Sequence, residues 1–191
     1  MVIGVGGNIG TGKTTVCKVF EYLGAHYISA DEVGWEVLPE IADALKTKFG
    51  KSIMNGGTID KKKLRDIVFS KRENLRFLNK LSHPILVKKI LKRIGDIKLG
   101  IIVIDAALLF DLPAIYKQVD YPILITADDK LKQERAMARG IDKVLFRRIL
   151  GLQSSEAEMS QQAKFIIRND GSMDVLKEQC QSIYEEIKND C

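Results

Sequence analysis

Apolar residues along the chain fall into two alternating patterns. Short continuous apolar runs predict buried strands, because the strands of a parallel sheet are covered on both faces. These runs lie at residues 1–5, 26–29, 101–104, 121–125 and 165–167. Residues 15–23 and 173–187 instead carry apolar side chains at helical spacing, which predicts amphipathic helices. This alternation predicts an α/β fold, with a five-stranded parallel sheet flanked by helices.

The stretch 31–100 is different, because it has long helical patterns and hardly any strand signal. Asp60 is a candidate N-cap for a helix over 61–69, and Pro84 is a candidate break or kink in an apolar stripe over 75–94. Such a block is either an insertion that carries substrate or a long crossover with extra helices. We divide the chain into a nucleotide-binding core (1–30, 101–139 and 163–191), a helical substrate region (31–100) and a small lid (140–162).

The composition is that of an ordinary globular protein. Hydrophobic residues make up 46% of the 191 residues and charged residues 29%, which excludes a disordered chain. No apolar run approaches the roughly 20 residues of a membrane-spanning helix, so no membrane partner is expected. The apolar start lacks the basic region of a signal peptide, and three sparse cysteines favour reduced thiols, so we expect a cytoplasmic protein. The size is typical of one domain in a monomer or a small homo-oligomer.

The net charge of +5 suggests an anionic partner without identifying it. Judged by charge alone, nucleic acid, an acidic membrane surface and a small polyanion all fit, and so does a solvated surface with surplus lysine. Nucleic-acid binding is disfavoured, because basic clusters interleaved with aromatic residues are absent from the sequence. Trp35 and Tyr22 are expected to be packing residues.

The clearest chemical signal is the glycine-rich segment 7–14, which matches G-x-x-x-x-G-K-[ST] at every fixed position. Glycines let backbone N–H groups turn toward an anion, and the following helix directs its positive end at phosphates. Lys13 would contact the β- and γ-phosphates of ATP, and the Thr14 hydroxyl would ligate Mg²⁺. The alternative is a glycine-rich turn with a surface lysine. The predicted nucleotide-binding residues here are Gly7, Asn8, Ile9, Gly10, Thr11, Gly12, Lys13, Thr14 and Thr15.

The use of the nucleotide is narrowed by motifs that are missing. Residues 31–34 match the D-x-x-G of GTPases, but no N-K-x-D guanine signature follows, and no L-S-G-G-Q-like segment suggests a transporter ATPase. The small size, the helical block and the basic segment favour a small-molecule kinase. Such an enzyme must exclude water, and a mobile lid that carries arginines can do so.

Two carboxylates and two arginines are candidates for phosphoryl transfer. Asp31 and Asp105 each follow a predicted strand, so they belong to the same sheet edge as the glycine-rich segment. Asp31 would accept the proton of the acceptor hydroxyl or orient the metal, although it could instead cap the following helix. Arg139, just before the candidate hinge Gly140, is the preferred phosphate clamp, and Arg148 is a second candidate. Each arginine could instead belong to a solvated helix face.

Taken together, these residues resemble the dephospho-CoA kinase family, from residue 3 to about residue 183. The resemblance rests on the glycine-rich segment, Asp31 after the second strand, the helix begun by Asp60, His83-Pro84, residues 107–111, Arg139 with Gln153, and Asn169-Asp170-Gly171. Ser29 stands where the family has a further acid, so Asp31 alone can carry that role. The resemblance implies a P-loop NTPase fold that transfers the γ-phosphate of ATP, with Mg²⁺, to the ribose 3′-hydroxyl of dephospho-CoA.

The resemblance also implies roles for individual residues. Lys13, Asp31 and Arg139 would be catalytic. Arg148, Asn169 and Gly171 would join the nucleotide site, with Asn169 and Gly171 near the adenine. The acceptor would contact Asp31, His83, Leu108 and Arg139, although a lone histidine such as His83 is more often a packing or capping residue. The rival hypotheses are a P-loop kinase that acts on a nucleoside or nucleotide, and a nucleotide-dependent regulatory module without transfer activity.

Overall fold

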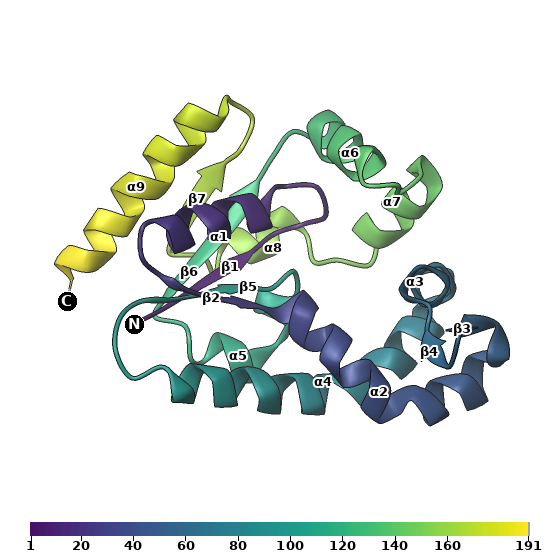
Figure 1. Cartoon of the computed structure of the whole chain (residues 1–191). Helices are drawn as coiled ribbons and strands as arrows, with labels where there is room; N and C mark the ends of the chain where they lie inside the picture. Colours follow the sequence, from purple (N-terminus) through teal and green to yellow (C-terminus); the bar gives the residue numbers. More distant parts are fainter. Residues whose placement is uncertain (191) are drawn as a thin grey trace.

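The centre of the molecule is a five-stranded parallel sheet (Figure 1). The structure is a computed structural model that describes residues 1–190 and leaves Cys191, one of the three cysteines, outside the described part. The strands are β1 (Val2–Gly6), β2 (His26–Ser29), β5 (Ile102–Asp105), β6 (Tyr121–Thr126) and β7 (Phe165–Arg168). Their order is β2-β5-β1-β6-β7, and every neighbouring pair is parallel. The predicted sheet is confirmed.

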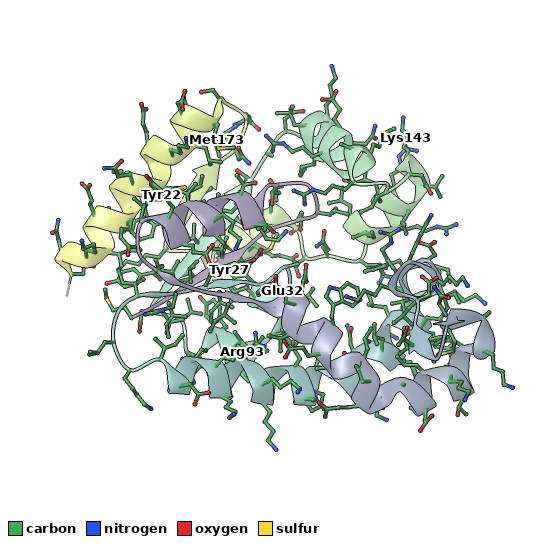
Figure 2. All side chains as sticks on the ribbon, in the orientation of Figure 1. Tyr22, Tyr27, Glu32, Arg93, Lys143 and Met173 are labelled. Atoms are coloured by element: carbon green, nitrogen blue, oxygen red, sulfur yellow. The ribbon has the colours of Figure 1, made fainter. Side chains whose placement is uncertain are left out.

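Helices cover both faces of this sheet, as the continuous apolar strands require. On one face, α1 (Lys13–Tyr22) and α9 (Met173–Asn189) bury Phe20 and Leu176 against strand residues such as Ile123. On the other face lie α2 (Ala30–Phe49), α4 (Arg72–Asp96) and α5 (Pro113–Tyr116) (Figure 1). These helices bury a second apolar cluster against the sheet. The sequence prediction that Tyr22 packs is wrong, because its side chain projects outward from α1 and is 89% exposed (Figure 2).

The helical block between β2 and β5 contains more than helices. It comprises α2, the 3₁₀ turn η1 (Lys51–Ile53), β3 (Met54–Asn55), β4 (Thr58–Ile59), α3 (Lys61–Val68) and α4. The small antiparallel hairpin β3–β4 was not predicted, because two-residue strands are too short to show a periodicity. Asp60 caps α3 as predicted, accepting from the N–H groups of Lys62 and Lys63. Helix α4 continues through Pro84 without a break.

The predicted lid segment, residues 140–162, consists of two short helices. Gly140, with φ of 76°, lies in the left-handed region between α6 (Asp129–Ala138) and α7 (Lys143–Leu150), and α8 (Glu156–Ser160) follows. Lys132 does not belong to a basic surface, because its side chain is buried and pairs with Asp129 and Glu156, each at 2.7 Å. The remaining element is the 3₁₀ turn η2 (Leu109–Asp111). Within residues 1–190, no helix is both long and apolar enough to span a bilayer.

Candidate active site

The glycine-rich loop lies between β1 and α1 and holds its shape through backbone conformations that favour glycine. Gly10 and Gly12 have φ of 81° and 94°. A Cβ atom on Gly10 would lie 2.2 Å from the carbonyl oxygen of Lys132, and one on Gly12 would lie 2.3 Å from Nδ2 of Asn169. The hydroxyl of Thr11 donates to the carbonyl oxygen of Asn8 at 2.9 Å and so closes the loop. The loop therefore needs glycine both for its turns and for its close approach to α6 and β7.

Lys13, the first residue of α1, folds back over this loop. Its ammonium donates to the carbonyl oxygen of Asn8 at 3.0 Å. Burial lowers the pKa of Lys13, while the carboxylates of Asp105 and Asp31 act to raise it and the charge of Arg139 lowers it further. Arg139 is an exposed residue at the end of α6, and its positive charge interacts with that of Lys13. The site thus gathers one lysine, one arginine and two carboxylates.

The two carboxylates lie beside the start of α1, at the carboxyl edge of the sheet. Asp105 ends β5, and its Oδ2 accepts from the Thr14 hydroxyl at 2.7 Å and from the Tyr27 hydroxyl at 3.3 Å. Asp31 lies in the first turn of α2, whose N-cap is Ser29 rather than Asp31. Loss of hydration beside the neighbouring protein groups raises the pKa of Asp31, and the negative charge of Asp105 raises it further. The alternative that Asp31 only caps a helix is therefore wrong.

Hydroxyl and carboxylate oxygens are the ligands that Mg²⁺ prefers. Thr14 and Asp105 offer such atoms at hydrogen-bond distance from each other. Across residues 1–190, no group of three or more His, Cys, Asp or Glu side chains is placed to hold a metal ion alone. These residues fit an ion that takes its other ligands from water and from substrate phosphates, which is how Mg²⁺ is commonly bound.

Asn169, one of the two residues predicted to lie near the adenine, supports the loop from the end of β7. Asn169 is buried, and its Nδ2 donates to the carbonyl oxygen of Thr11 at 2.8 Å. Arg135, on α6, in turn donates to the carbonyl oxygen of Asn169 at 2.9 Å. Gly171 follows two residues later, just before α9. The structure therefore brings Asn169 to the loop, where it contacts the backbone.

The lid segment reaches the loop through Gln153. Its Oε1 accepts from the N–H of Ile9 at 2.9 Å, so the chain after α7 lies against the tip of the loop. Ser154 donates to the Asp111 carboxylate at 2.7 Å. That carboxylate acts to raise the pKa of His83, which burial lowers more strongly. His83 therefore lies where α4, η2 and the lid segment meet, and Leu108 is a half-buried residue immediately before η2.

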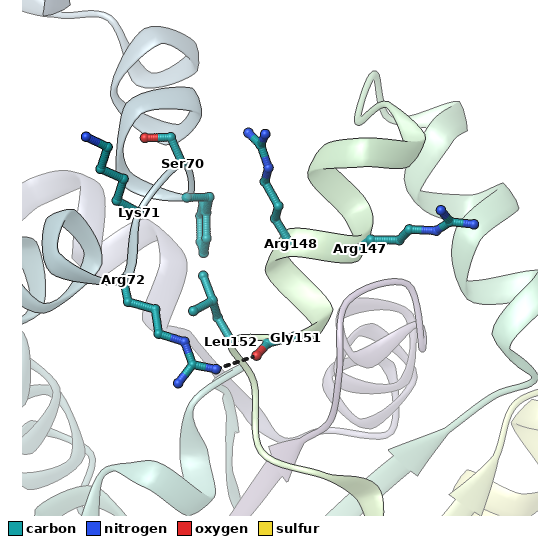
Figure 3. Close-up of a pocket in the computed structure, with 8 residues that line it drawn as sticks. Ser70, Lys71, Arg72, Arg147, Arg148, Gly151 and Leu152 are labelled. Carbon is teal, nitrogen blue, oxygen red and sulfur yellow. Dashed lines mark hydrogen bonds between the residues drawn. The ribbon is translucent and has the colours of Figure 1, made fainter.

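Arg148, on α7 of the lid segment, lines a cleft (Figure 3). The cleft, of about 210 Å³, separates α7 from the junction of α3 and α4. Arg72 crosses it and donates to the carbonyl oxygen of Gly151 at 3.3 Å. Figure 3 shows Arg147 and Arg148 leaving α7 in different directions, with Arg148 toward the segment that carries Ser70 and Lys71. The lining residues are Phe69, Ser70, Lys71, Arg72, Arg147, Arg148, Gly151 and Leu152.

Sequence reasoning missed one member of this site. Tyr27 contacts Asp105 because β2 pairs with β5 in the register Ser29 to Asp105, which brings the end of one strand beside the end of the other. Tyr27 belongs to an apolar strand, and nothing in its spacing marked it. Figure 2 labels Tyr27 and Glu32 on either side of the point where β2 passes into α2. Asp105 was a candidate for phosphoryl transfer because it follows a predicted strand, and in the structure its carboxylate accepts a hydrogen bond from Thr14.

Comparison with known proteins agrees with this geometry. A family model described as dephospho-CoA kinase matches residues 1–174. The dephospho-CoA kinase of Aquifex aeolicus is 37% identical over 98% of each chain, and that of Carboxydothermus hydrogenoformans is 34% identical over 98% of this chain and 94% of its own.

Solved structures point the same way. The dephospho-CoA kinase of Campylobacter jejuni superposes with a TM-score of 0.70 at 27% identity, over 100% of this chain and 98% of its own. Shikimate kinase from Acinetobacter baumannii, at 13% identity and a TM-score of 0.56 over 99% of this chain and 93% of its own, shares the fold alone. The sheet, the glycine-rich loop and the family match together show that the chain belongs to the dephospho-CoA kinase family.

Proposed function

We propose that the protein transfers the γ-phosphate of ATP to the ribose 3′-hydroxyl of dephospho-CoA, giving coenzyme A and ADP. The observation that carries the proposal is the meeting of Lys13, Asp31 and Asp105 at one edge of the sheet in a chain of this family. Phosphoryl transfer needs little covalent help from a protein, so the position and charge of these groups are the main contributions.

ATP would lie along the loop 7–15, with backbone N–H groups and the start of α1 against its phosphates. The ammonium of Lys13 would exchange its bond to the Asn8 carbonyl for phosphate oxygens, and their negative charge would restore its pKa toward the ordinary value. Thr14 and Asp105 would hold Mg²⁺. When bound, that ion neutralises charge on the β- and γ-phosphates.

Asp31 would face the acceptor hydroxyl. Its raised pKa makes it a stronger proton acceptor than an ordinary aspartate, and its exposure leaves it open to a ligand. Arg139, whose charge already acts on Lys13, would clamp the transferring phosphoryl group from the far side. Arg148 would bind nucleotide phosphates from α7 once the lid closes, and Asn169 and Gly171 would border the adenine.

The helical region 31–100 would hold the acceptor, with His83 and Leu108 beside it. The lid 140–162 would close over both substrates and exclude water, turning at Gly140. The buried thiols of Cys17 and Cys180 favour a reducing compartment, and we therefore place the reaction in the cytoplasm.

The test is ADP release with and without dephospho-CoA, with the product examined by ³¹P NMR for a new ribose phosphate. We expect release that depends on the acceptor, and loss of release in a Lys13→Ala variant. An acceptor analogue that lacks the 3′-hydroxyl is the matched control and should give no release above background. Equal release with and without dephospho-CoA would reject the proposal, and transfer to a nucleoside or nucleotide in a substrate panel would favour the rival kinase.

A further inference from the structure

Trp35 is a large, partly exposed aromatic side chain near the proposed acceptor site. It is the single tryptophan of the chain and is 40% exposed, although the sequence predicted a packing role. It lies on α2 one helical turn after Asp31, and residues four apart on a helix are neighbours on its surface. The indole is therefore adjacent to the carboxylate that would face the reacting hydroxyl.

The ion pairs of α2 show which side of this helix faces α4. Glu36 pairs with Arg93 at 2.6 Å and Glu40 pairs with Lys89 at 2.9 Å, so their edge of the helix faces α4. Asp31 and Trp35 belong to the neighbouring edge, one residue earlier in each turn. There the ammonium of Lys61, from the start of α3, lies 4.4 Å from the centre of the Trp35 ring. Trp35 thus lies between Asp31 and α3.

We propose that Trp35 is the platform on which the adenine base of the acceptor stacks. The inference rests on the proposed function, because it is the acceptor ribose at Asp31 that brings the base within reach. An exposed indole offers a flat surface to any base, and such stacking contributes substantially to the binding of unpaired bases. The ammonium of the exposed Lys61 lies over one face of the ring, and it would leave that face and turn toward the diphosphate to which the adenosine is joined.

This role separates the two substrates, although both contain adenine. The phosphates of ATP would bind to the loop 7–15, and its base would lie beside Asn169 and Gly171. Trp35 lies elsewhere, on α2 one turn after Asp31. Loss of the indole should therefore weaken binding of the acceptor and leave binding of ATP as it is.

Steady-state kinetics with each substrate varied in turn test the assignment. A Trp35→Ala variant should raise KM for dephospho-CoA about 5- to 100-fold with KM for ATP unchanged, whereas Trp35→Phe should keep most of the affinity. Tyr22→Ala, which removes an exposed aromatic side chain from α1, is the control and should match the wild type. An unchanged KM for dephospho-CoA in Trp35→Ala, or an equal rise for ATP, would overturn the inference.

Fluorescence gives a second readout that does not depend on turnover. Because Trp35 is the single tryptophan, indole emission excited at its red edge reports on this position alone. Dephospho-CoA should change the emission in a saturable way, and 4′-phosphopantetheine, which lacks the base, should not. No change with dephospho-CoA, or the same change with ATP alone, would overturn the inference. Transfer activity that persists in either case would leave the proposed function standing.

Discussion

At the scale of single residues, Asp31 illustrates a conflict between chemistry and stability. A group whose pKa is raised on folding is disfavoured in its charged form, so it destabilises the folded chain at pH values above that pKa. Asp31→Asn should abolish most of the transfer activity, because the amide cannot accept the hydroxyl proton. It should also raise the free energy of unfolding, because it removes the disfavoured charge. The gain should be at most about 1 kcal/mol at neutral pH, because the side chain is exposed and partly hydrated.

Denaturant unfolding at neutral pH and near pH 3 measures this effect. At the lower pH, where Asp31 is protonated in the wild type, the difference between wild type and variant should shrink. Glu32→Gln, which neutralises the next side chain of α2, is the matched control for a general change in charge. A variant that is less stable than the wild type at neutral pH would contradict the account.

The same shift predicts the pH dependence of catalysis. Protonated Asp31 cannot accept the hydroxyl proton, so kcat should fall as the pH decreases through a pKa above the ordinary aspartate value. In Asp31→Asn this acidic fall should disappear from the residual activity. The measurement is kcat against pH for both proteins at saturating substrates. An identical acidic fall in the variant would assign that titration to another group.

The sequence predicted the residues whose roles follow from spacing and missed those whose roles follow from register. Lys13 and Thr14 are fixed by the loop motif and the helix that it begins. Tyr27 reaches Asp105 only because β2 lies beside β5, and the order of strands cannot be read from one sequence. Asn169 was predicted beside adenine, yet the structure also gives it a contact with the loop backbone.

At the scale of elements, the approach of the loop to α6 makes Gly10 irreplaceable. The Cβ of an alanine at this position would clash with the Lys132 carbonyl, and the alanine would also have to adopt a left-handed backbone conformation. Gly10→Ala should lower the free energy of unfolding by about 3 kcal/mol and weaken ATP binding.

Gly57, in the β3–β4 turn, is the control for this variant. It has φ of 88° with open space around it, so Gly57→Ala isolates the conformational strain and should cost about 1 kcal/mol. Denaturant unfolding and ATP titration compare the two variants. Equal stability losses with ATP binding intact would contradict the account.

The sequence predicted the elements that are long or continuous. The five strands and the helices α1, α3 and α9 agree with their predicted ranges to within one or two residues. The β3–β4 hairpin left only Asn55 and the two turn glycines, Gly56 and Gly57, as a signal. Pro84 was a candidate break, but its ring is exposed and the packing of α4 against α2 through Leu86 and Ile90 maintains the helix. Buried Lys132 could not be told from a surface lysine, because its acidic partner Glu156 lies on a different helix.

At the scale of the whole molecule, the cleft beside Arg148 lies between the two parts that would close on the substrates, and basic side chains line it from both sides. Lys71 and Arg72 come from the helical region, while Arg147 and Arg148 come from the lid segment (Figure 3). A polyanion in the cleft would reduce the repulsion between them. Arg148→Ala should raise the KM of one or both anionic substrates several-fold and leave the stability unchanged.

Lys143→Ala removes an exposed charge from the start of the same helix and is the control (Figure 2). Kinetics at low and moderate salt compare the two variants, and the effect of Arg148→Ala should shrink as salt rises. Equal effects of both variants would show that only the overall charge matters.

The central claim is that Asp31 presents the acceptor hydroxyl to a phosphate held by Lys13. A crystal structure with a non-hydrolysable ATP analogue and dephospho-CoA tests it most directly. We predict the triphosphate along residues 7–15 and the ribose 3′-oxygen within hydrogen-bond distance of the Asp31 carboxylate, in line with the γ-phosphorus. A triphosphate bound away from the loop, or a 3′-oxygen out of reach of Asp31, would contradict the account.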